Sequence, residues 1–175
     1  FRQEKIMAKS TFSGPVKSLA GFISAGVNNS VSLTADTTLT VDAHAGKILL
    51  CNDADGKFTL PSIVTTTPSD PTDPNQTNNI GASFYFYIET AATDLDIKTD
   101  GTDKFKGAVI VAVDDGSKKA FVPGATNDVM TLNGSTKGGI VGSVVQVTAI
   151  DAATYLVHNS LLIGSGTIVT PFADA

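Results

Sequence analysis

The feature that most constrains this chain is a series of short strand patterns separated by turn signals, without a convincing stretch of helical periodicity. From Val31 onward, apolar or alternating segments recur about every 8–12 residues between Gly, Pro, Asn and Asp. The segments favoured as strands are 31–34, 39–41, 47–52, 57–61, 83–90, 95–99, 105–113, 118–122, 129–132, 143–150, 155–157, 161–163 and 167–172. Such spacing predicts an all-β fold, and the hairpin signals favour an antiparallel β-sandwich or a jelly-roll-like barrel.

Two local patterns sharpen this prediction. Asp53-Ala54-Asp55-Gly56 lies between two apolar runs and is a hairpin signal, because glycine accepts the positive φ that tight turns require. Segment 83–90, SFYFYIET, is rich in aromatic residues, which favour strands. Its aromatic side chains alternate onto both faces, so we expect a central strand that is covered on both sides.

The 175 residues suffice for one domain preceded by an arm. Met7 begins a segment typical of a translation start, so residues 1–6 are extra residues, either a cloning remnant or the product of an earlier start codon. Glycine and proline interrupt every helical period in residues 7–30, which we interpret as an N-terminal arm. This arm packs on its own domain or docks on a neighbour. Residues 31–175 are predicted to form a single β-sandwich domain.

A long polar loop interrupts the predicted domain at residues 65–81, TTTPSDPTDPNQTNNIG. Loops of this length without structure of their own are uncommon in compact domains. The segment is either a solvated surface loop or a protrusion that touches a neighbouring subunit or a host surface.

The charge balance disfavours nucleic acid as a partner. The chain has 12 basic and 17 acidic residues and a net charge of −5, whereas phosphate neutralisation needs a basic surface. No apolar run approaches the roughly 20 residues of a membrane-spanning helix, so we expect no membrane contact. No charged-then-apolar leader opens the sequence, and we expect no secretory signal.

Residues for catalysis are few. The chain has two histidines, His44 and His158, and one cysteine, Cys51, which lies in an apolar strand pattern where it behaves as a small hydrophobic residue. No motif supports a Cys51–His44 pair. A glycosidase needs two facing carboxylates, but Glu89 is the only glutamate of the predicted domain and the aspartates lie mostly in turns. The sequence therefore predicts a non-enzymatic protein without catalytic residues or a cofactor.

Metal and phosphate motifs are incomplete. Asp53 and Asp55 before Gly56 are similar to the opening of a calcium loop, but the glutamate required further on is missing. Asp114-Asp115-Gly116 is interpreted in the same way, as a plain turn. The glycines between 134 and 142 lack the Gly-Lys-Ser/Thr ending of a phosphate loop. We therefore expect no metal site.

The order of several motifs resembles structural proteins of tailed bacteriophages. The resemblance covers roughly residues 11–172 and rests on LTADTTLTVDAHAGKILLCNDADGKFTLP, FYFYIETAATDLDIKTDGTDKFKG, MTLNGSTKGGIVGSVVQVTAI, TYLVHNS and the closing GSGTIVTPF. The opening MAKSTFSGPVKSL is similar to the start of such proteins. The resemblance implies a virion protein, most like a head decoration (cement) protein that binds the major capsid protein at the capsid exterior. It would be made in the cytoplasm of the bacterial host.

Two alternatives follow from this resemblance. The first is a decoration protein, a homotrimer or other homo-oligomer, that stabilises the shell and docks through its arm. The second is a head-fibre or tail-tip module that contacts the host, although fibres usually carry repeats and this sequence has none. The arm residues expected to contact a partner are apolar: Phe12, Val16, Leu19, Phe22 and Ile23.

Overall fold

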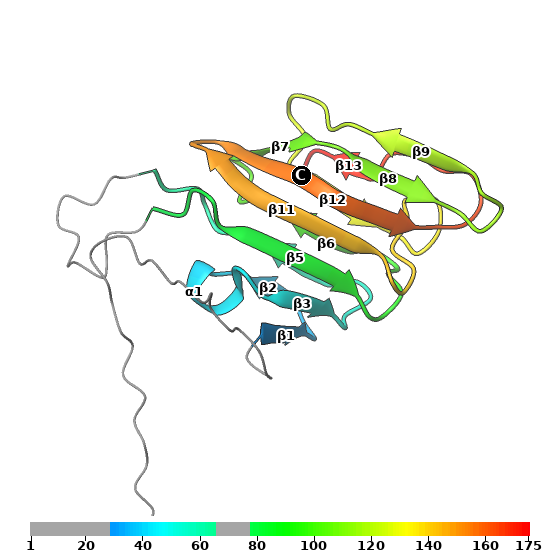
Figure 1. Cartoon of the computed structure of the whole chain (residues 1–175), viewed down its shortest axis with the longest axis horizontal. Helices are drawn as coiled ribbons and strands as arrows, with labels where there is room; N and C mark the ends of the chain where they lie inside the picture. The colour runs from blue at the N-terminus through cyan, green and yellow to red at the C-terminus, as the bar shows by residue number, and fades with distance from the viewer. Residues whose placement is uncertain (1–28, 66–77) are drawn as a thin grey trace, which may run out of the picture.

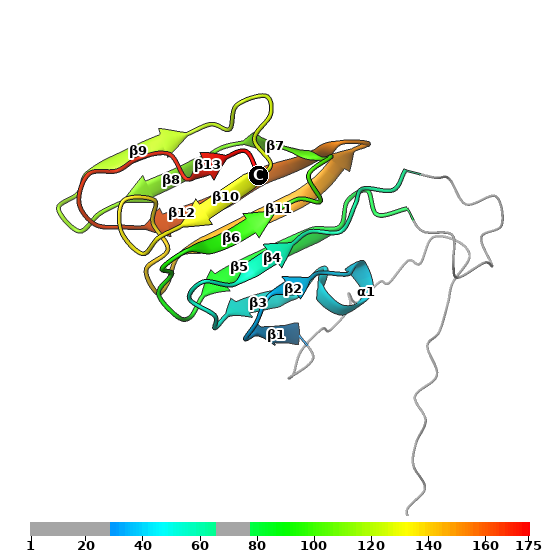
Figure 2. The same ribbon diagram turned by 180° about the vertical axis from the view of Figure 1, so that it is seen from behind.

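The computed structural model describes residues 29–65 and 78–175, which form thirteen strands and one short helix. They build two sheets that lie one behind the other (Figures 1 and 2). The front sheet has eight strands in the order β1 (Ser30–Leu33), β3 (Ile48–Cys51), β5 (Ser83–Ile88), β11 (Val144–Asp151), β12 (Thr154–Ile163), β8 (Val109–Ala112) and β9 (Lys118–Phe121), and β7 (Lys104–Gly107) also pairs with β12. The back sheet has five strands in the order β13 (Phe172–Ala173), β10 (Val129–Leu132), β6 (Leu95–Lys98), β4 (Lys57–Thr59) and β2 (Thr37–Thr38).

One hydrophobic core joins the two sheets. Alternate residues of each strand are buried, as the period-2 pattern of the sequence requires. The rings of Phe58 and Phe86, one from each sheet, stack with their centroids 6.4 Å apart. The largest fully buried side chains are those of Tyr155, Phe58, Phe84, Phe86, Phe105, Leu39, Leu49, Leu60, Ile88, Leu95, Ile97 and Met130. Each such side chain contributes about 1.5–3 kcal/mol to folding when it leaves water.

The first half of the chain winds between the sheets in three stacked circuits, which we call coils. Each coil has one strand in front and the next behind: β1 and β2, then β3 and β4, then β5 and β6. Neighbouring coils pair in parallel, in the front sheet and in the back sheet. The all-β prediction is confirmed, but the sheets are mixed and open. The antiparallel sandwich or jelly-roll arrangement is therefore not confirmed.

The hairpin predicted at Asp53–Gly56 is wrong, because this turn carries the chain from β3 in front to β4 behind. Gly56 is needed there for space, since it has no positive φ. A Cβ on Gly56 would lie 2.8 Å from the ring of Phe58, which fills the core below the turn. The Asp-Gly signal therefore marks a close approach of backbone and ring.

The loop predicted at 65–81 is an insertion into this winding. Ser30 pairs with Ile48, 18 residues later, whereas Ile48 pairs with Tyr85, 37 residues later. The second interval is longer because residues 65–81 lie within it, between β4 and β5. The two ends of this insertion lie side by side, since Asn79 N–H donates to the Val64 carbonyl at 3.0 Å.

The second half contains the antiparallel pairs β5–β11, β11–β12 and β8–β9. The segments predicted at 155–157 and 161–163 form one strand, β12, with a bulge at Asn159, which has a φ of 45°. The strand predicted at 105–113 is instead divided into β7 and β8, both parallel to β12. The strand predicted at 39–41 is also wrong, because a short helix, α1 (Val41–His44), begins there after Thr40, whose hydroxyl accepts from Ala43 N–H.

Candidate interaction surface

The outer face of the front sheet is uncharged across most of its width. Its outward side chains alternate with the buried ones on β3, β5, β11 and β12. Away from the β11–β12 turn they are Ile48, Leu50, Ser83, Tyr85, Tyr87, Val144, Gln146, Thr148, Leu156, His158, Leu161 and Ile163. No Asp, Glu, Lys or Arg occurs among these twelve, although such residues make up 17% of the chain. Charges lie at the margin of the face, on Asp151 beside the β11–β12 turn and on Lys106 of β7 beside Leu156. A sheet face that met only water would be expected to carry its share of charge.

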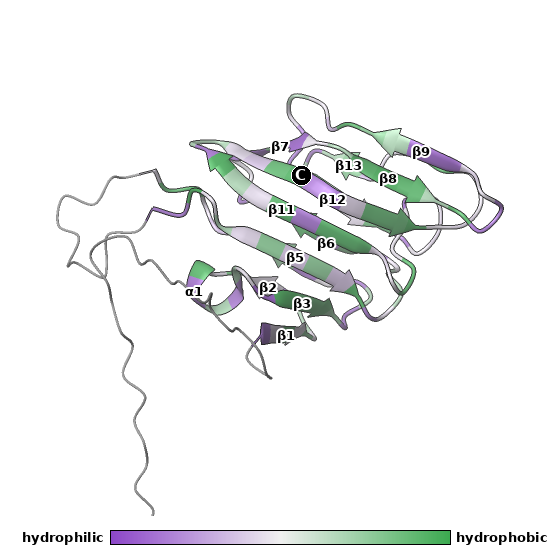
Figure 3. Cartoon of the chain, in the orientation of Figure 1, coloured by the Kyte–Doolittle hydropathy of each residue, from purple (hydrophilic) through white to green (hydrophobic). Residues whose placement is uncertain are grey.

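An apolar row crosses this face from strand to strand. The strand register places Leu50 beside Tyr87, Tyr87 beside Val144, Val144 beside Leu161 and Leu161 beside Ile110. Leu161 and Ile110 are 46% and 45% exposed. Figure 3 shows hydrophobic colour on β3, on β8 and at the end of β12, where this row lies. We call these five residues the apolar row.

Beside the row lies a small polar cluster. The hydroxyls of Ser83 and Thr148 lie 2.6 Å apart, and the Thr148 hydroxyl lies 2.8 Å from Nε2 of His158. The Asn159 amide, on the β12 bulge, donates to the Gln146 side chain at 3.0 Å. The cluster keeps its polar groups paired with one another on the surface, so it can meet a partner without leaving buried groups unpaired.

The outer face of the back sheet is different, because it carries paired charges. The Lys57 ammonium lies 3.0 Å from Asp94 and 3.1 Å from Asp96, and Lys98 follows on β6. Burial lowers the pKa of Lys57, but hydrogen bonds to both carboxylates outweigh it and the pKa is raised. The Thr131 hydroxyl donates to the Asp96 carboxylate at 2.7 Å on the same face. The two outer faces therefore differ in charge, which sequence composition alone does not reveal.

The prediction for β5 is confirmed in part. The strand is central in the front sheet, between β3 and β11. Its inward residues Phe84 and Phe86 are fully buried, but Tyr85 and Tyr87 are only half-buried on the outer face. Within the described residues, no other element covers this second aromatic face (Figure 1). The prediction that β5 is covered on both sides is therefore wrong for the face that carries Tyr85 and Tyr87.

The residues considered for catalysis are not brought together. Nδ1 of His44 accepts from Thr40 N–H at 2.9 Å, within the first turn of α1. Cys51 is fully buried, its thiol contacts the Leu49 carbonyl at 3.8 Å, and burial raises its pKa to about 12. A thiol with this pKa stays protonated at neutral pH and is a poor nucleophile. His158 belongs to the polar cluster described above.

The acidic turns have structural contacts of their own. Asp55 N–H donates to Asp53 at 3.4 Å, and contact with the Asp55 side chain is the main cause that raises the pKa of Asp53. Asp115 accepts from Ser117 N–H at 2.7 Å in the β8–β9 turn. Over residues 29–65 and 78–175, no three His, Cys, Asp or Glu side chains are grouped so as to hold a metal ion.

The arm residues proposed as partner contacts, Phe12, Val16, Leu19, Phe22 and Ile23, lie outside the described residues. The base of the loop at 65–81 is described, and its closure depends on a residue that the sequence did not single out. Asn79 is 6% exposed; its side chain accepts from Val64 N–H at 2.7 Å and donates to the Ser62 carbonyl at 2.8 Å. In the sequence, the one indication of this role is the position of an asparagine next to Ile80-Gly81, at the end of the polar segment.

Comparisons with known proteins identified no relative of this chain. No family model, curated protein or solved structure matches this chain. In the part of the chain that the structure describes, no helix has the length and apolar character of a membrane span.

Proposed function

We propose that this protein is a non-enzymatic virion structural protein that binds the outer surface of a phage capsid and stabilises the shell. The observation that carries the proposal is the contrast between the two outer faces: the front sheet is uncharged over most of β3, β5, β11 and β12 and has an apolar row, and the back sheet has paired charges. In a docked molecule the front face would contact the capsid protein and the back face would meet water.

The residue types of the front face suit a protein partner. Depletion of charge and enrichment in aromatic residues such as tyrosine distinguish the centre of an interface from the rest of a surface. Tyr85 and Tyr87 offer apolar area with little entropy to lose, and their hydroxyls can bond to the partner. The Ser83–Thr148–His158 cluster would lie at the margin of such a contact.

The size of the face indicates a modest affinity for each copy. Strands lie about 4.8 Å apart, so the row from β3 to β8 spans roughly 20 Å. Standard interfaces need about 800 Å² from each partner, which is more than this row alone offers. A repeated shell compensates, because many copies bind only the assembled form and each shifts the equilibrium toward it. The arm predicted at 7–30 would add further contacts.

The test compares binding of variants to capsid shells that lack this protein. We expect Leu161→Lys to lower co-sedimentation with shells at least tenfold, because it would bury an unpaired charge in the interface. Val122→Lys is the matched control, since Val122 is 71% exposed and lies outside the apolar row. Both variants should remain folded, as both positions face solvent.

Equal binding by the two variants would contradict the proposed face. The alternative function, a head-fibre or tail-tip module, predicts another result. Leu161→Lys would then leave incorporation into virions unchanged and would reduce adsorption to the host. Quantitative mass spectrometry of purified virions separates the two functions further. A decoration protein should be present in a simple ratio to the major capsid protein, and a fibre or tail component in a few copies.

A further inference from the structure

Both sheets end on the same side of the molecule, and within the described residues the edge of the front sheet there carries no protection. In the described part of the chain, β1 and β2 are the terminal strands of the front and back sheets. Their sequences, SVSL and TT, contain no charge and no proline. Exposed strand edges usually carry charges, prolines or bulges that prevent pairing with another chain.

The opposite edge of the front sheet has such protection, because it is formed by β9, which begins with Lys118 and Lys119. In the back sheet the two terminal strands, β2 and β13, are both only two residues long. Within the described residues, the unprotected edge is therefore the β1 edge of the front sheet.

Side-chain hydrogen bonds between neighbouring coils fix the turns beside this edge. At the turn after β3, the Asn52 side chain donates to Ser32 of the first coil at 2.8 Å and to Glu89 of the third coil at 2.7 Å. Lys57 N–H likewise donates to Asp36 of the first coil at 2.8 Å. The second coil thus bonds to the first coil at Ser32 and at Asp36, beside the β1 edge.

We propose that β1 pairs with β1 of a second copy of this chain, antiparallel, about a two-fold axis normal to the sheets. A two-fold contact uses the same patch on both copies and closes at two subunits. This rotation joins the front sheet of one copy to the front sheet of the other. In the back sheets it brings the two β2 edges toward each other. Main-chain hydrogen bonds between β1 strands would then continue the front sheet across the dimer.

The side chains of β1 select the register. Directly opposed residues of an antiparallel pair point to the same face. Val31 and Leu33 point into the core, whereas Ser30 and Ser32 are exposed. The register with Ser32 opposite Ser32 places Val31 opposite Leu33 twice, so the apolar layer runs on through the dimer. A shift of one residue would oppose inward and outward side chains.

Charge selects the antiparallel direction. One end of the edge carries Asp36, with Asp53 and Asp55 of the next coil beside it. The hydrogen bond between the Asp53 and Asp55 side chains, together with the charges of Asp55 and Asp36, raises the pKa of Asp53. At the other end, α1 and the start of β3 carry Asp42, His44 and Lys47. The two-fold axis brings each acidic end to the mixed end of the other copy. A parallel pairing would bring the two acidic ends together.

The pairing does not rest on the proposed function, because it needs no capsid. It involves four residues of β1 and two of β2, so we expect a dimer in rapid, concentration-dependent exchange with monomer. Anchoring on any repeated surface would raise the effective concentration of neighbouring edges and strengthen it.

The test is disulfide trapping in the full-length chain with Ser32→Cys, and Ser30→Cys as the matched control. In the proposed register the two Ser32 Cα atoms lie about 4.5–5.5 Å apart, within the range of a disulfide. The two Ser30 Cα atoms are then four residues apart, about 13 Å, which is too far. The native cysteine, Cys51, is fully buried and does not compete.

We expect Ser32→Cys to form the covalent dimer on the order of tenfold faster than Ser30→Cys under the same oxidant, since paired edges hold the two thiols together. Sedimentation equilibrium of the unmodified protein should show a monomer–dimer exchange. Equal rates, faster trapping of Ser30→Cys, or no trapping of either variant would overturn the proposal. A protein that is purely monomeric at all concentrations would also overturn it.

Discussion

At the scale of single residues, close backbone approaches explain where this chain departs from its predicted elements. Gly107 is the last residue of β7, two positions before β8 begins, and has a φ of +99°. A Cβ at this position would collide with the Val157 carbonyl of β12. The apolar pattern from 105 to 113 predicts one strand, but the backbone contact with β12 requires a break. The glycine that marks the break looks like any strand glycine in the sequence.

Replacement of Gly107 by alanine should therefore be severely destabilising. The change forces a strained φ and a backbone collision, and we expect a loss of about 3 kcal/mol or more. Gly116→Ala is the matched control, since Gly116 has a φ of +85° but no atom within 4 Å of its Cβ position. We expect the control to lose only about 1–2 kcal/mol from backbone strain. Urea denaturation measures both, and equal losses would mean that the collision with β12 relaxes.

At the scale of elements, turns decide how the strands are connected but not how they pair. The sequence predicts most strand positions correctly, because inward residues such as those of β5 and β11 alternate cleanly. It does not predict the parallel coils, since Asp53–Gly56 has the composition of a hairpin turn and serves as a crossover between sheets. Parallel pairing of β1 with β3 depends on contacts far apart in the sequence, which local turn chemistry does not encode. The uncharged face follows from this pairing, so it could not be assembled from the sequence either.

The insertion between the second and third coils depends on Asn79 in the same way. Asn79→Ala would leave Val64 N–H and the Ser62 carbonyl without their side-chain partner. Because Asn79 is buried, we expect a loss of about 1–3 kcal/mol in the free energy of unfolding. Asn78→Ala is the control, since Asn78 is exposed and bonds only locally to Ile80 N–H. Thermal denaturation of the two variants should separate them, and similar midpoints would show that the insertion closes without Asn79.

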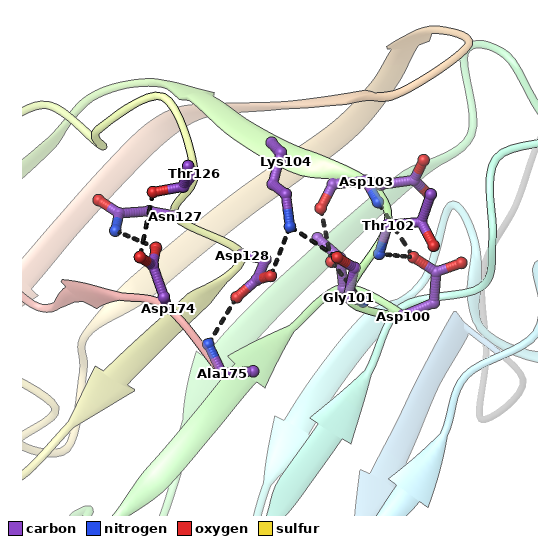
Figure 4. A network of polar contacts seen from close by, with 11 residues as sticks. Asp100, Gly101, Thr102, Asp103, Lys104, Thr126, Asn127, Asp128, Asp174 and Ala175 are labelled. Carbon is purple, nitrogen blue, oxygen red and sulfur yellow. Dashed lines mark hydrogen bonds and ion pairs between the residues drawn. The ribbon is translucent and has the colours of Figure 1, made fainter.

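At the scale of the whole molecule, a polar network ties the end of the chain to the sheets (Figure 4). The carboxylate of Asp128 accepts from the Lys104 ammonium at 2.6 Å and from Ala175 N–H at 2.8 Å. Asp174 accepts from Thr126 and Asn127. The network holds β13 beside β10, and β13 brings Phe172 against Phe105 of the core, with ring centroids 6.4 Å apart.

This network should make stability depend on pH. Burial tends to raise the pKa of Asp128, but the bonds from Lys104 and Ala175 outweigh burial and the pKa is lowered. The folded pKa then lies below the unfolded value of about 3.9, so the stabilisation is complete above that pH. It is lost as the pH falls through the folded pKa. Acid should therefore remove the contribution of Asp128.

We expect Asp128→Asn to lower the free energy of unfolding at pH 7 by about 1–3 kcal/mol. The difference from the unmodified protein should shrink below about pH 4, where the carboxylate becomes protonated in the unfolded chain and then in the folded one. Urea denaturation from pH 2.5 to 7 provides the measurement. A difference that stays constant over this range would show that the charge of Asp128 is unimportant.

The coil stack has a consequence for how such a chain can change over generations. The strands of the first two circuits pair only with strands of neighbouring circuits, and those of the third also pair with β11 and β10. Duplication of about twenty residues could therefore lengthen the stack, and deletion could shorten it, without redesign of the antiparallel half. The insertion between β4 and β5 shows that the winding already tolerates extra chain at one corner. Proteins of this design can thus gain or lose length in whole steps and keep the same uncharged face in register.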